Sequence, residues 1–300
     1  MKKSAAVLIA FIAVFAFLPP AFAQDGKAKL SVFVSILPQA YFLERIGGKH
    51  VDVGVLVGEG QSPHTYEPTP KQMAKLATAK AYFRIGVPVE RGVLRKIRQS
   101  HKNLVIVETQ KGIAYRTLAG HDHDHGEGHV KGHEVKGHKT PDPHIWMDPK
   151  LVKIQSRNIY DALCRLDPAH TQDYTENLKA FQTDLDRVDA RISRSLVPLK
   201  GRMMYVFHPA FGYFADSYGL VQAPIEIEGK EPGAKQLARL IERAKKDRVK
   251  VIFVQPQFSI RSAGTVAKEI GGVVIPINPL ARDYLANLEK IAAAVEQGLR

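Results

Sequence analysis

The sequence predicts an α/β protein of two lobes, each with a parallel sheet and crossover helices, joined by one long rigid helix. Short β-rich runs alternate with helical patterns in residues 29–107, and the same alternation returns after residue 200. One continuous helical pattern lies between the two regions. The chain has 300 residues, 45% hydrophobic and 24% charged, a composition that excludes a mainly disordered protein. It has a single long apolar run, which excludes a multi-span membrane protein.

Residues 1–23 have the pattern of a secretory signal peptide. Lys2 and Lys3 give a positive start, and residues 5–18 form an apolar run that is too short to span a bilayer comfortably. An Ala-x-Ala cleavage pattern follows at residues 21–23. We therefore expect cleavage after Ala23 and a periplasmic mature protein, the alternative being an uncleaved anchor.

The first predicted lobe covers residues 24–166. Its expected strands are residues 29–36, 51–57, 81–85 and 104–107, and its expected helices are residues 39–46, 69–79 and 89–99. Because strands and helices alternate, we expect these strands to run parallel in one sheet, with the helices as crossovers.

A single helix is predicted over residues 167–198. Six apolar residues follow one another at steps of three and four, which places them on one helical face: Tyr174, Leu178, Phe181, Leu185, Val188 and Ile192. Pro168 suits the beginning of a helix and Pro198 its end. About 30 helical residues would give a rod of about 45 Å. A coiled-coil or bundle helix is the alternative, but a brace between two α/β lobes fits the pattern better.

The second predicted lobe covers residues 199–300. Its expected strands are residues 202–207, 249–254 and 272–277, and its expected helices are residues 234–246, 259–269 and 281–299. The two lobes share an architecture but no sequence repeat.

Charge and cysteine content narrow the possible partners. The net charge is +13 and the chain has one cysteine, Cys164, so neither an intrachain disulfide nor a Cys-rich zinc finger can form. A periplasmic address argues against a nucleic-acid partner. Attraction to a membrane surface or to an acidic partner remains open.

Residues 121–138 form a loop built from metal ligands and glycines. Half of the twelve histidines lie in it: His121, His123, His125, His129, His133 and His138. Imidazoles interleaved with carboxylates suit transition metals. Ordering a flexible segment costs about 1–2 kcal/mol per residue, so we expect a weak accessory metal loop. A merely solvated polar loop is the alternative.

Three further histidines lie in contexts that predict order. His64, His144 and His208 each have a proline nearby, and each is expected at the carboxyl end of a strand or in the loop after it. Ligands bind at that edge in open α/β sheets. Each histidine alone is more often structural, but together they predict a three-imidazole metal site between the lobes. Three imidazoles favour zinc over manganese, while copper and nickel would also bind.

The segments SPHTYEP, PHIWMDP and FHPAFGYF resemble motifs of the metal-binding solute receptors of bacterial ABC importers, the cluster A-I or ZnuA-like family. The resemblance covers nearly the whole mature chain, including the long helix and the His-rich insertion. It implies two lobes around one Zn²⁺ ion bound by His64, His144 and His208. It also implies delivery of that ion to an ABC transporter permease, and we expect a monomer.

One position departs from the family pattern. Zinc members commonly carry Asp-Pro-Leu near the C-terminus, where this chain has Asn278, Pro279 and Leu280. The fourth ligand could therefore be Asn278, a water molecule or a nearby acid such as Asp283. Three neutral imidazoles would leave the 2+ charge of zinc uncompensated among the direct ligands.

Two other functions compete with a zinc receptor. A receptor for manganese or another divalent metal would share the fold. A periplasmic zinc hydrolase would share three histidines and an open position. The sequence has no His-Glu-x-x-His motif, no Gly-x-Ser-x-Gly motif and no phosphate-binding glycine loop. We interpret the acids near the motifs, Glu67, Glu226, Glu228 and Glu231, as structural, and we do not expect an enzyme. A passive metal buffer fits the loop but not an ordered cleft.

Overall fold

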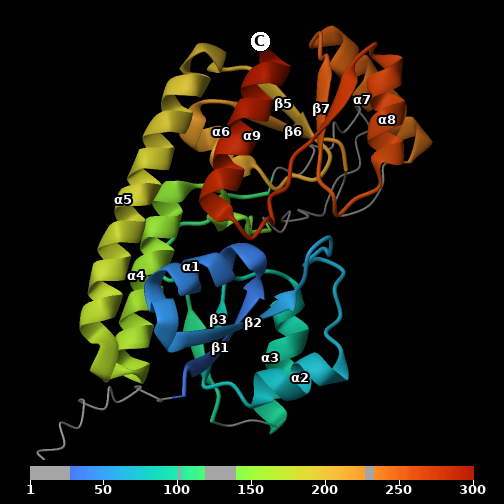
Figure 1. Ribbon diagram of the computed structural model, residues 1–300. Helices are drawn as coiled ribbons and strands as arrows, with labels where there is room; N and C mark the ends of the chain where they lie inside the picture. Colours follow the sequence, from blue (N-terminus) through green and yellow to red (C-terminus); the bar gives the residue numbers. More distant parts are fainter. Residues whose placement is uncertain (1–27, 101–102, 119–139, 227–232) are drawn as a thin grey trace, which may run out of the picture.

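The computed structural model describes residues 28–100, 103–118, 140–226 and 233–300, and it confirms the two-lobed α/β architecture (Figure 1). The first lobe holds a four-stranded sheet in the order β2-β1-β3-β4, in which each pair of neighbours is parallel. Its elements are β1 (Leu30–Ile36), α1 (Leu37–Gly47), β2 (Val51–Val57), α2 (Pro70–Ala77), β3 (Ala81–Arg84), α3 (Val89–Ser100) and β4 (Val105–Glu108).

The second lobe repeats this arrangement with a parallel sheet in the order β6-β5-β7-β8. Its elements are β5 (Met203–Val206), α6 (Gly212–Tyr218), β6 (Val221–Pro224), α7 (Ala234–Lys246), β7 (Val251–Val254), α8 (Ile260–Glu269), β8 (Val273–Pro276) and α9 (Tyr284–Leu299). The sequence did not predict α6 or β6. Both are short, and β6 contains Gln222 and ends on Pro224, which weakens its strand pattern.

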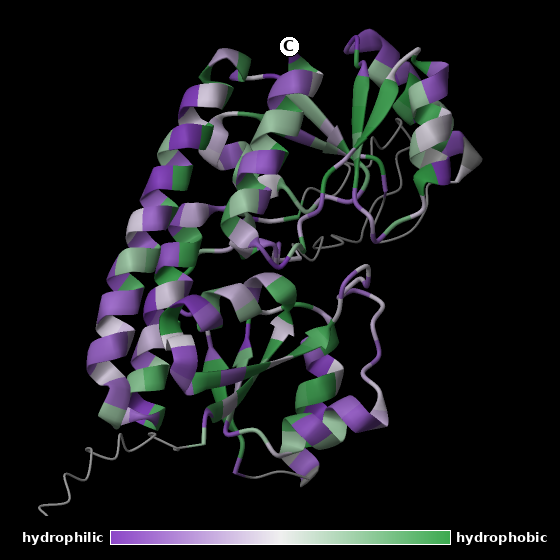
Figure 2. Cartoon of the chain, in the orientation of Figure 1, coloured by the Kyte–Doolittle hydropathy of each residue, from purple (hydrophilic) through white to green (hydrophobic). Residues whose placement is uncertain are grey.

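The central strands are buried because helices cover both faces of each sheet. β1 becomes fully buried from Val32 to its end, and β7 is buried throughout. Such strands are continuous apolar runs rather than alternating ones, as parallel sheets require. In Figure 2 the strands of both sheets are mostly hydrophobic, while α5 carries many hydrophilic residues.

One long helix links the two lobes, as the sequence predicts, and a second helix packs along it. α5 (Thr171–Leu196) has 26 residues and is extended by a 3₁₀ turn at each end, Pro168–His170 and Val197–Leu199. Its α-helical part is about 39 Å long, and with the two 3₁₀ turns the helix covers residues 168–199, close to the predicted 167–198. The six predicted apolar residues are all buried. α4 (Pro149–Leu166), which was not predicted as a separate helix, packs along α5 (Figure 1).

Aromatic and charged contacts join the brace to both lobes. The rings of Phe42 on α1 and Tyr284 on α9 meet edge to face at 4.8 Å between centroids. Arg45 on α1 pairs with Asp184 on α5 at 2.7 Å. The two lobes therefore share one continuous hydrophobic core along α5. In the part of the chain that the structure describes, the search for a helix apolar and long enough to cross a bilayer finds none.

Candidate metal centre

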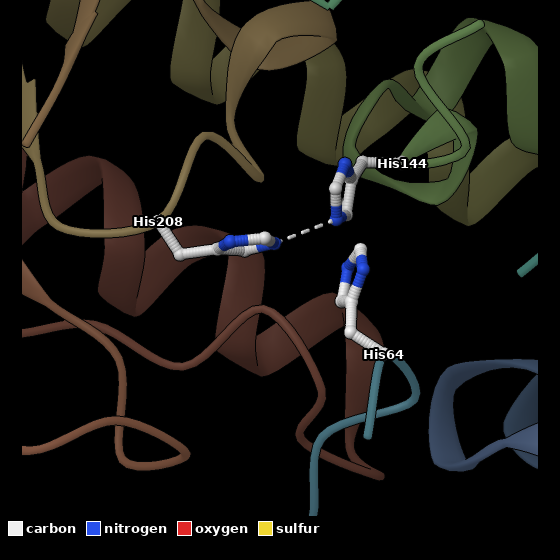
Figure 3. A group of neighbouring side chains, drawn as sticks. All are labelled: His64, His144 and His208. Atoms are coloured by element: carbon white, nitrogen blue, oxygen red, sulfur yellow. Dashed lines mark hydrogen bonds between the residues drawn. The ribbon is translucent and has the colours of Figure 1, made fainter. Parts of the chain in front are cut away.

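Three imidazoles from both lobes meet between the two sheets (Figure 3). One ring nitrogen from each of His64, His144 and His208 lies within 4.8 Å of the others. The Nε2 atoms of His144 and His208 are 3.2 Å apart. The Nε2 atom of His64 is buried and has no hydrogen-bond partner among the described residues. Because a buried polar atom without a partner is costly, this nitrogen is poised for a ligand that the protein does not supply.

His64 is positioned by a turn after β2. The amides of Thr65 and Tyr66 donate to the carbonyl of Ser62, which closes the turn around the histidine. The amide of Val89, at the beginning of α3, donates to the carbonyl of Pro63 at 3.1 Å. The ring therefore rests on the first lobe through the beginning of α3.

His144 is held by a buried carboxylate. Oδ1 of Asp142 accepts hydrogen bonds from both the amide and Nδ1 of His144, at 3.0 and 2.7 Å. Arg116 contacts the other oxygen of Asp142 at 3.2 Å. A Cβ on Gly212 would lie 1.3 Å from the guanidinium of Arg116, so a larger residue there would displace this arginine from Asp142. Tyr213 donates to the carbonyl of Asp142 at 2.9 Å, which fastens this segment to α6 of the second lobe.

His208 directly follows β5 and is also held by a carboxylate. Its Nδ1 atom donates to Oε1 of Glu226 at 2.5 Å. Gln255, fully buried after β7, accepts from the amide of His208 and donates to its carbonyl, at 3.0 and 2.7 Å. Phe258 stacks on the imidazole with ring centroids 4.8 Å apart. The neighbouring loops thus fix both the backbone and the ring of this histidine.

Burial keeps two of the rings neutral. Burial, with His144 and His208 close by, lowers the pKa of His64 to about 3. Burial also lowers the pKa of His208, although the hydrogen bond to Glu226 acts in the opposite direction. Burial alone would raise the pKa of Asp142, but His144 and Arg116 together bring it below the usual value. At neutral pH the site therefore offers unprotonated imidazoles beside an ionised carboxylate.

Asp142 and Glu226 aim two of the imidazoles and supply negative charge. Because each carboxylate accepts from Nδ1, the lone pair of Nε2 points to the centre, as in carboxylate–histidine–metal triads. The two Nε2 lone pairs of His144 and His208 face each other, which is unfavourable unless a proton or a metal ion lies between them. The two carboxylates also lie directly behind the ligand atoms, so the charge of a divalent ion would be compensated.

The space between the rings accommodates an ion but no organic molecule. Its volume is about 10 Å³, close to the minimum for one water molecule. Trp146, Phe258, Pro279 and Leu280 are among its walls, so part of the lining is apolar. Such a narrow site suits a single cation.

The two residues considered for a fourth ligand do not join the three rings. Oδ1 of Asn278 accepts hydrogen bonds from Nε2 of Gln257 at 3.0 Å and from the amide of Leu280 at 2.9 Å. Asn278 is not among the residues that line the cavity. Asp283 is exposed and lies outside the group of three. The accessory histidines His121, His123, His125, His129, His133 and His138 lie outside the described residues.

Sequence reasoning missed two of the residues that hold the rings. Asp142 and Gln255 were not singled out, and Glu226 was interpreted only as a structural acid. The signal for Asp142 is its position two residues before His144, from which its side chain can reach back to the histidine amide and ring. Glu226 follows β6, a strand that the sequence did not predict.

Comparisons with known proteins agree with this geometry. A family model described as "Zinc-uptake complex component A periplasmic" matches residues 32–298. The high-affinity zinc uptake system protein ZnuA of Bacillus subtilis is 32% identical over 265 residues, which cover 85% of this chain and 80% of that protein. The zinc-binding protein AdcA of Streptococcus pyogenes is 30% identical over 93% of this chain. The match covers only 56% of AdcA, so the chain spans little more than half of that relative.

A solved structure extends the comparison to three dimensions. The crystal structure of a ZnuA deletion mutant with zinc bound superposes with a TM-score of 0.81 and 39% sequence identity. The match covers 91% of this chain and 98% of that chain. The likeness therefore includes both lobes and the helical brace.

Proposed function

The chain belongs to the family of periplasmic zinc-uptake component A proteins, and from this premise we propose that it is an extracytoplasmic solute-binding protein for Zn²⁺. It captures one ion with His64, His144 and His208 and delivers it to an ABC permease for import. Zinc is the cargo of this protein rather than a resident cofactor. The observation that carries the proposal is the convergence of three imidazoles, those of His144 and His208 buried and that of His64 with a buried, unpartnered Nε2 atom.

The donor set favours zinc over manganese. Zinc takes nitrogen ligands readily in tetrahedral sites, at about 2.0–2.1 Å, whereas manganese prefers oxygen ligands. No carboxylate in the described part of the chain joins the three rings. A water molecule at the fourth position would complete a tetrahedron, and Asn278 or Asp283 would have to move to take that position.

A route for release of the ion follows from how its three ligands are distributed between the two lobes. His64 rests on the first lobe, whereas His208 belongs to the second lobe and His144 is fastened to α6 through Tyr213. A small separation of the lobes would withdraw His64 and leave the other two imidazoles together. The ion would then lose one of its ligands as the receptor docks on the permease.

A receptor is better supported than a zinc hydrolase. A hydrolase needs space for its substrate beside the metal-bound water, and the cavity holds little more than one water molecule. Both carboxylates near the site are engaged with ring nitrogens, which leaves neither of them free to act as a general base.

The proposed cellular setting completes the function. Residues 1–23 would direct export and be cleaved after Ala23, so that the mature protein works as a monomer in the periplasm. The relatives' names support zinc uptake. The histidines of residues 121–138 would collect ions weakly and pass them to the cleft.

Calorimetric zinc titration of the mature protein tests this proposal. Replacing His64, His144 or His208 by Ala should abolish the tight site, and deleting residues 121–138 should remove only weak additional sites. The proposal fails if the loop deletion removes the tight site while the three substitutions leave it intact. Zinc-dependent hydrolysis of ester or phosphate substrates, lost in the same three variants, would instead favour the enzyme.

A further inference from the structure

Four helices carry most of the excess positive charge of the protein. α2, α3, α7 and α8 together contain 13 Lys or Arg residues and three Glu residues. α1, α4, α5 and α9 are longer in total, yet they contain ten Lys or Arg residues and nine Asp or Glu residues. The charge is therefore segregated between two groups of helices rather than spread evenly over the protein.

The four basic helices lie at the ends of the lobes farthest from the brace. α2 and α3 lie at that end of the first lobe, and α7 and α8 lie at that end of the second (Figure 1). We call the exposed side of α7 and α8, with Lys235, Arg239, Lys245, Lys246, Arg261 and Lys268, the basic surface.

The sequence of α7 builds a predominantly cationic stripe, which Glu242 alone interrupts. Lys235, Arg239, Arg243 and Lys246 are spaced by four, four and three residues, so they share one side of the helix. Leu240 is buried on the other side, against the second-lobe sheet. The first lobe has a shorter counterpart, because α2 and α3 each present exposed cations four residues apart.

Among the described residues, five of the ten cations on α1, α4, α5 and α9 pair with an acid, whereas none of the six cations of the basic surface does. Lys153 pairs with Asp186 at 2.7 Å, and Arg191 pairs with Glu289 at 2.9 Å. Among the described residues, Arg243 is the one cation of α7 or α8 that has an acidic partner, Asp247 at 3.9 Å. The basic surface therefore presents uncompensated charge to its surroundings.

We propose that the basic surface binds the anionic headgroups of a phospholipid bilayer. Long, flexible cations spread along a helix suit a plane of mobile phosphates, since each Lys or Arg near such a surface contributes independently. A protein partner usually requires aromatic or apolar anchors at the centre of the contact. The stripe of α7 contains none, and Ile260, at the beginning of α8, is the one large apolar residue that is exposed among the described residues of these two helices, at 64%.

Such binding would keep the receptor close to the membrane that holds its permease. It would be electrostatic and reversible, and it would weaken as salt is added because exposed charges are screened. The inference does not rest on the proposed zinc site, because lipid binding is measured equally well without metal. A failure of one proposal can thus be distinguished from a failure of the other.

Co-sedimentation of the mature protein with vesicles tests the inference. One set of vesicles contains phosphatidylglycerol mixed with phosphatidylcholine, and the other contains phosphatidylcholine alone. The test variant combines Lys235→Gln, Arg239→Gln, Lys245→Gln and Lys246→Gln. The control variant removes the same number of exposed charges from α4, α5 and α9, through Arg157→Gln, Lys179→Gln, Arg194→Gln and Lys290→Gln.

The protein should bind the anionic vesicles, and the test variant should bind them at least about tenfold more weakly. The affinity of the control variant for the anionic vesicles should stay within about threefold of that of the unmodified protein, because the charges that it lacks lie away from the basic surface. Equal losses of vesicle binding in both variants would show that binding depends only on the net charge of the protein, and would overturn the proposal. Binding only to phosphatidylcholine vesicles that contain the permease, lost in the test variant, would assign the surface to a protein and also overturn it.

Discussion

Two of the three imidazoles are held by carboxylates, and the third is held by the turn around it. Asp142 and Glu226 fix Nδ1 of His144 and His208, whereas no acid holds the ring of His64 in this way. The charge that balances a bound cation therefore comes from residues that do not touch it. Because both acids are buried and hydrogen-bonded, their positions are set before any ion arrives.

Asp142→Asn is expected to weaken zinc binding by about 10–100-fold, as is typical when such an orienting partner is lost. The substitution keeps the shape of the side chain but removes its charge and disturbs the hydrogen bonds to His144. Isothermal titration calorimetry with zinc measures the effect. Glu67→Gln is the matched control, because Glu67 is exposed and lies three residues after His64, in another segment of the site. Equal affinities for the two variants would contradict the role assigned to Asp142.

The low pKa of His64 predicts how the stability of the metal-free protein depends on pH. The folded value is about 3, against an ordinary value of about 6.5 for the unfolded chain. Between these values the unfolded chain binds a proton that the folded protein does not bind. The free energy of unfolding should therefore fall as pH decreases from 6.5 toward 3. Above pH 6.5 the contribution of His64 to this pH dependence vanishes.

His64→Asn should remove that contribution, which amounts to roughly 2 kcal/mol at pH 5. Urea denaturation of the metal-free protein at several pH values measures it. The variant should lose less stability on acidification than the unmodified protein does. Parallel losses in both proteins would show that His64 is not held neutral by the fold.

Among the elements, β3 and α3 together support the turn that carries His64. Glu90, at the beginning of α3, is 1% exposed. Its carboxylate accepts hydrogen bonds from the amides of Ile85 and Gly86, at 2.7 and 2.8 Å, and from Ser35 at 2.5 Å. The amide of Val89, the residue before Glu90, donates to the carbonyl of Pro63 and so joins α3 to the segment that carries His64.

Glu90→Ala should lower the free energy of unfolding by about 2–4 kcal/mol, because it leaves several buried donors without an acceptor. It should also weaken zinc binding, since the turn that carries His64 loses its support. Urea denaturation and zinc calorimetry measure the two effects. Glu108→Gln is the control. Arg84 pairs with both Glu90 and Glu108, at 3.3 and 3.0 Å, but Glu108 is 55% exposed, so its loss should cost less than about 1 kcal/mol. Similar costs for both variants would argue against the buried network.

Elements with strong periodicity could be predicted from the sequence, and weakly patterned ones could not. The face of α5 was predicted residue by residue, since six apolar residues kept steps of three and four. β6 was missed because four residues ending in proline give little signal. α4 was not predicted, although its buried residues, such as Val152 and Ile159, follow a helical spacing.

At the scale of the whole molecule, parallel topology brings distant residues together. His64 follows β2, His208 follows β5 and Glu226 follows β6, so the carboxyl edges of the two sheets face each other across the cleft. This rule allowed the meeting of the three histidines to be predicted from sequence. The pairing of Glu226 with His208 could not be predicted, because it depends on β6 lying beside β5.

The brace explains how the two edges can stay aligned while the cleft still opens. α5 packs against α1 of the first lobe and α9 of the second, and Trp146 donates to the carbonyl of Pro279 across the cleft at 2.8 Å. The packing of α5 on both lobes and the hydrogen bond of Trp146 restrict the lobes to small movements. A small movement is enough to withdraw His64 from the other two ligands.

Anomalous diffraction at the zinc edge, from crystals of the zinc-loaded mature protein, tests the central claim most directly. The account predicts one dominant peak in the cleft, about 2.0–2.1 Å from Nε2 of His64, His144 and His208. A dominant peak among residues 121–138, or a cleft ion that leaves out one of these three imidazoles, would contradict it.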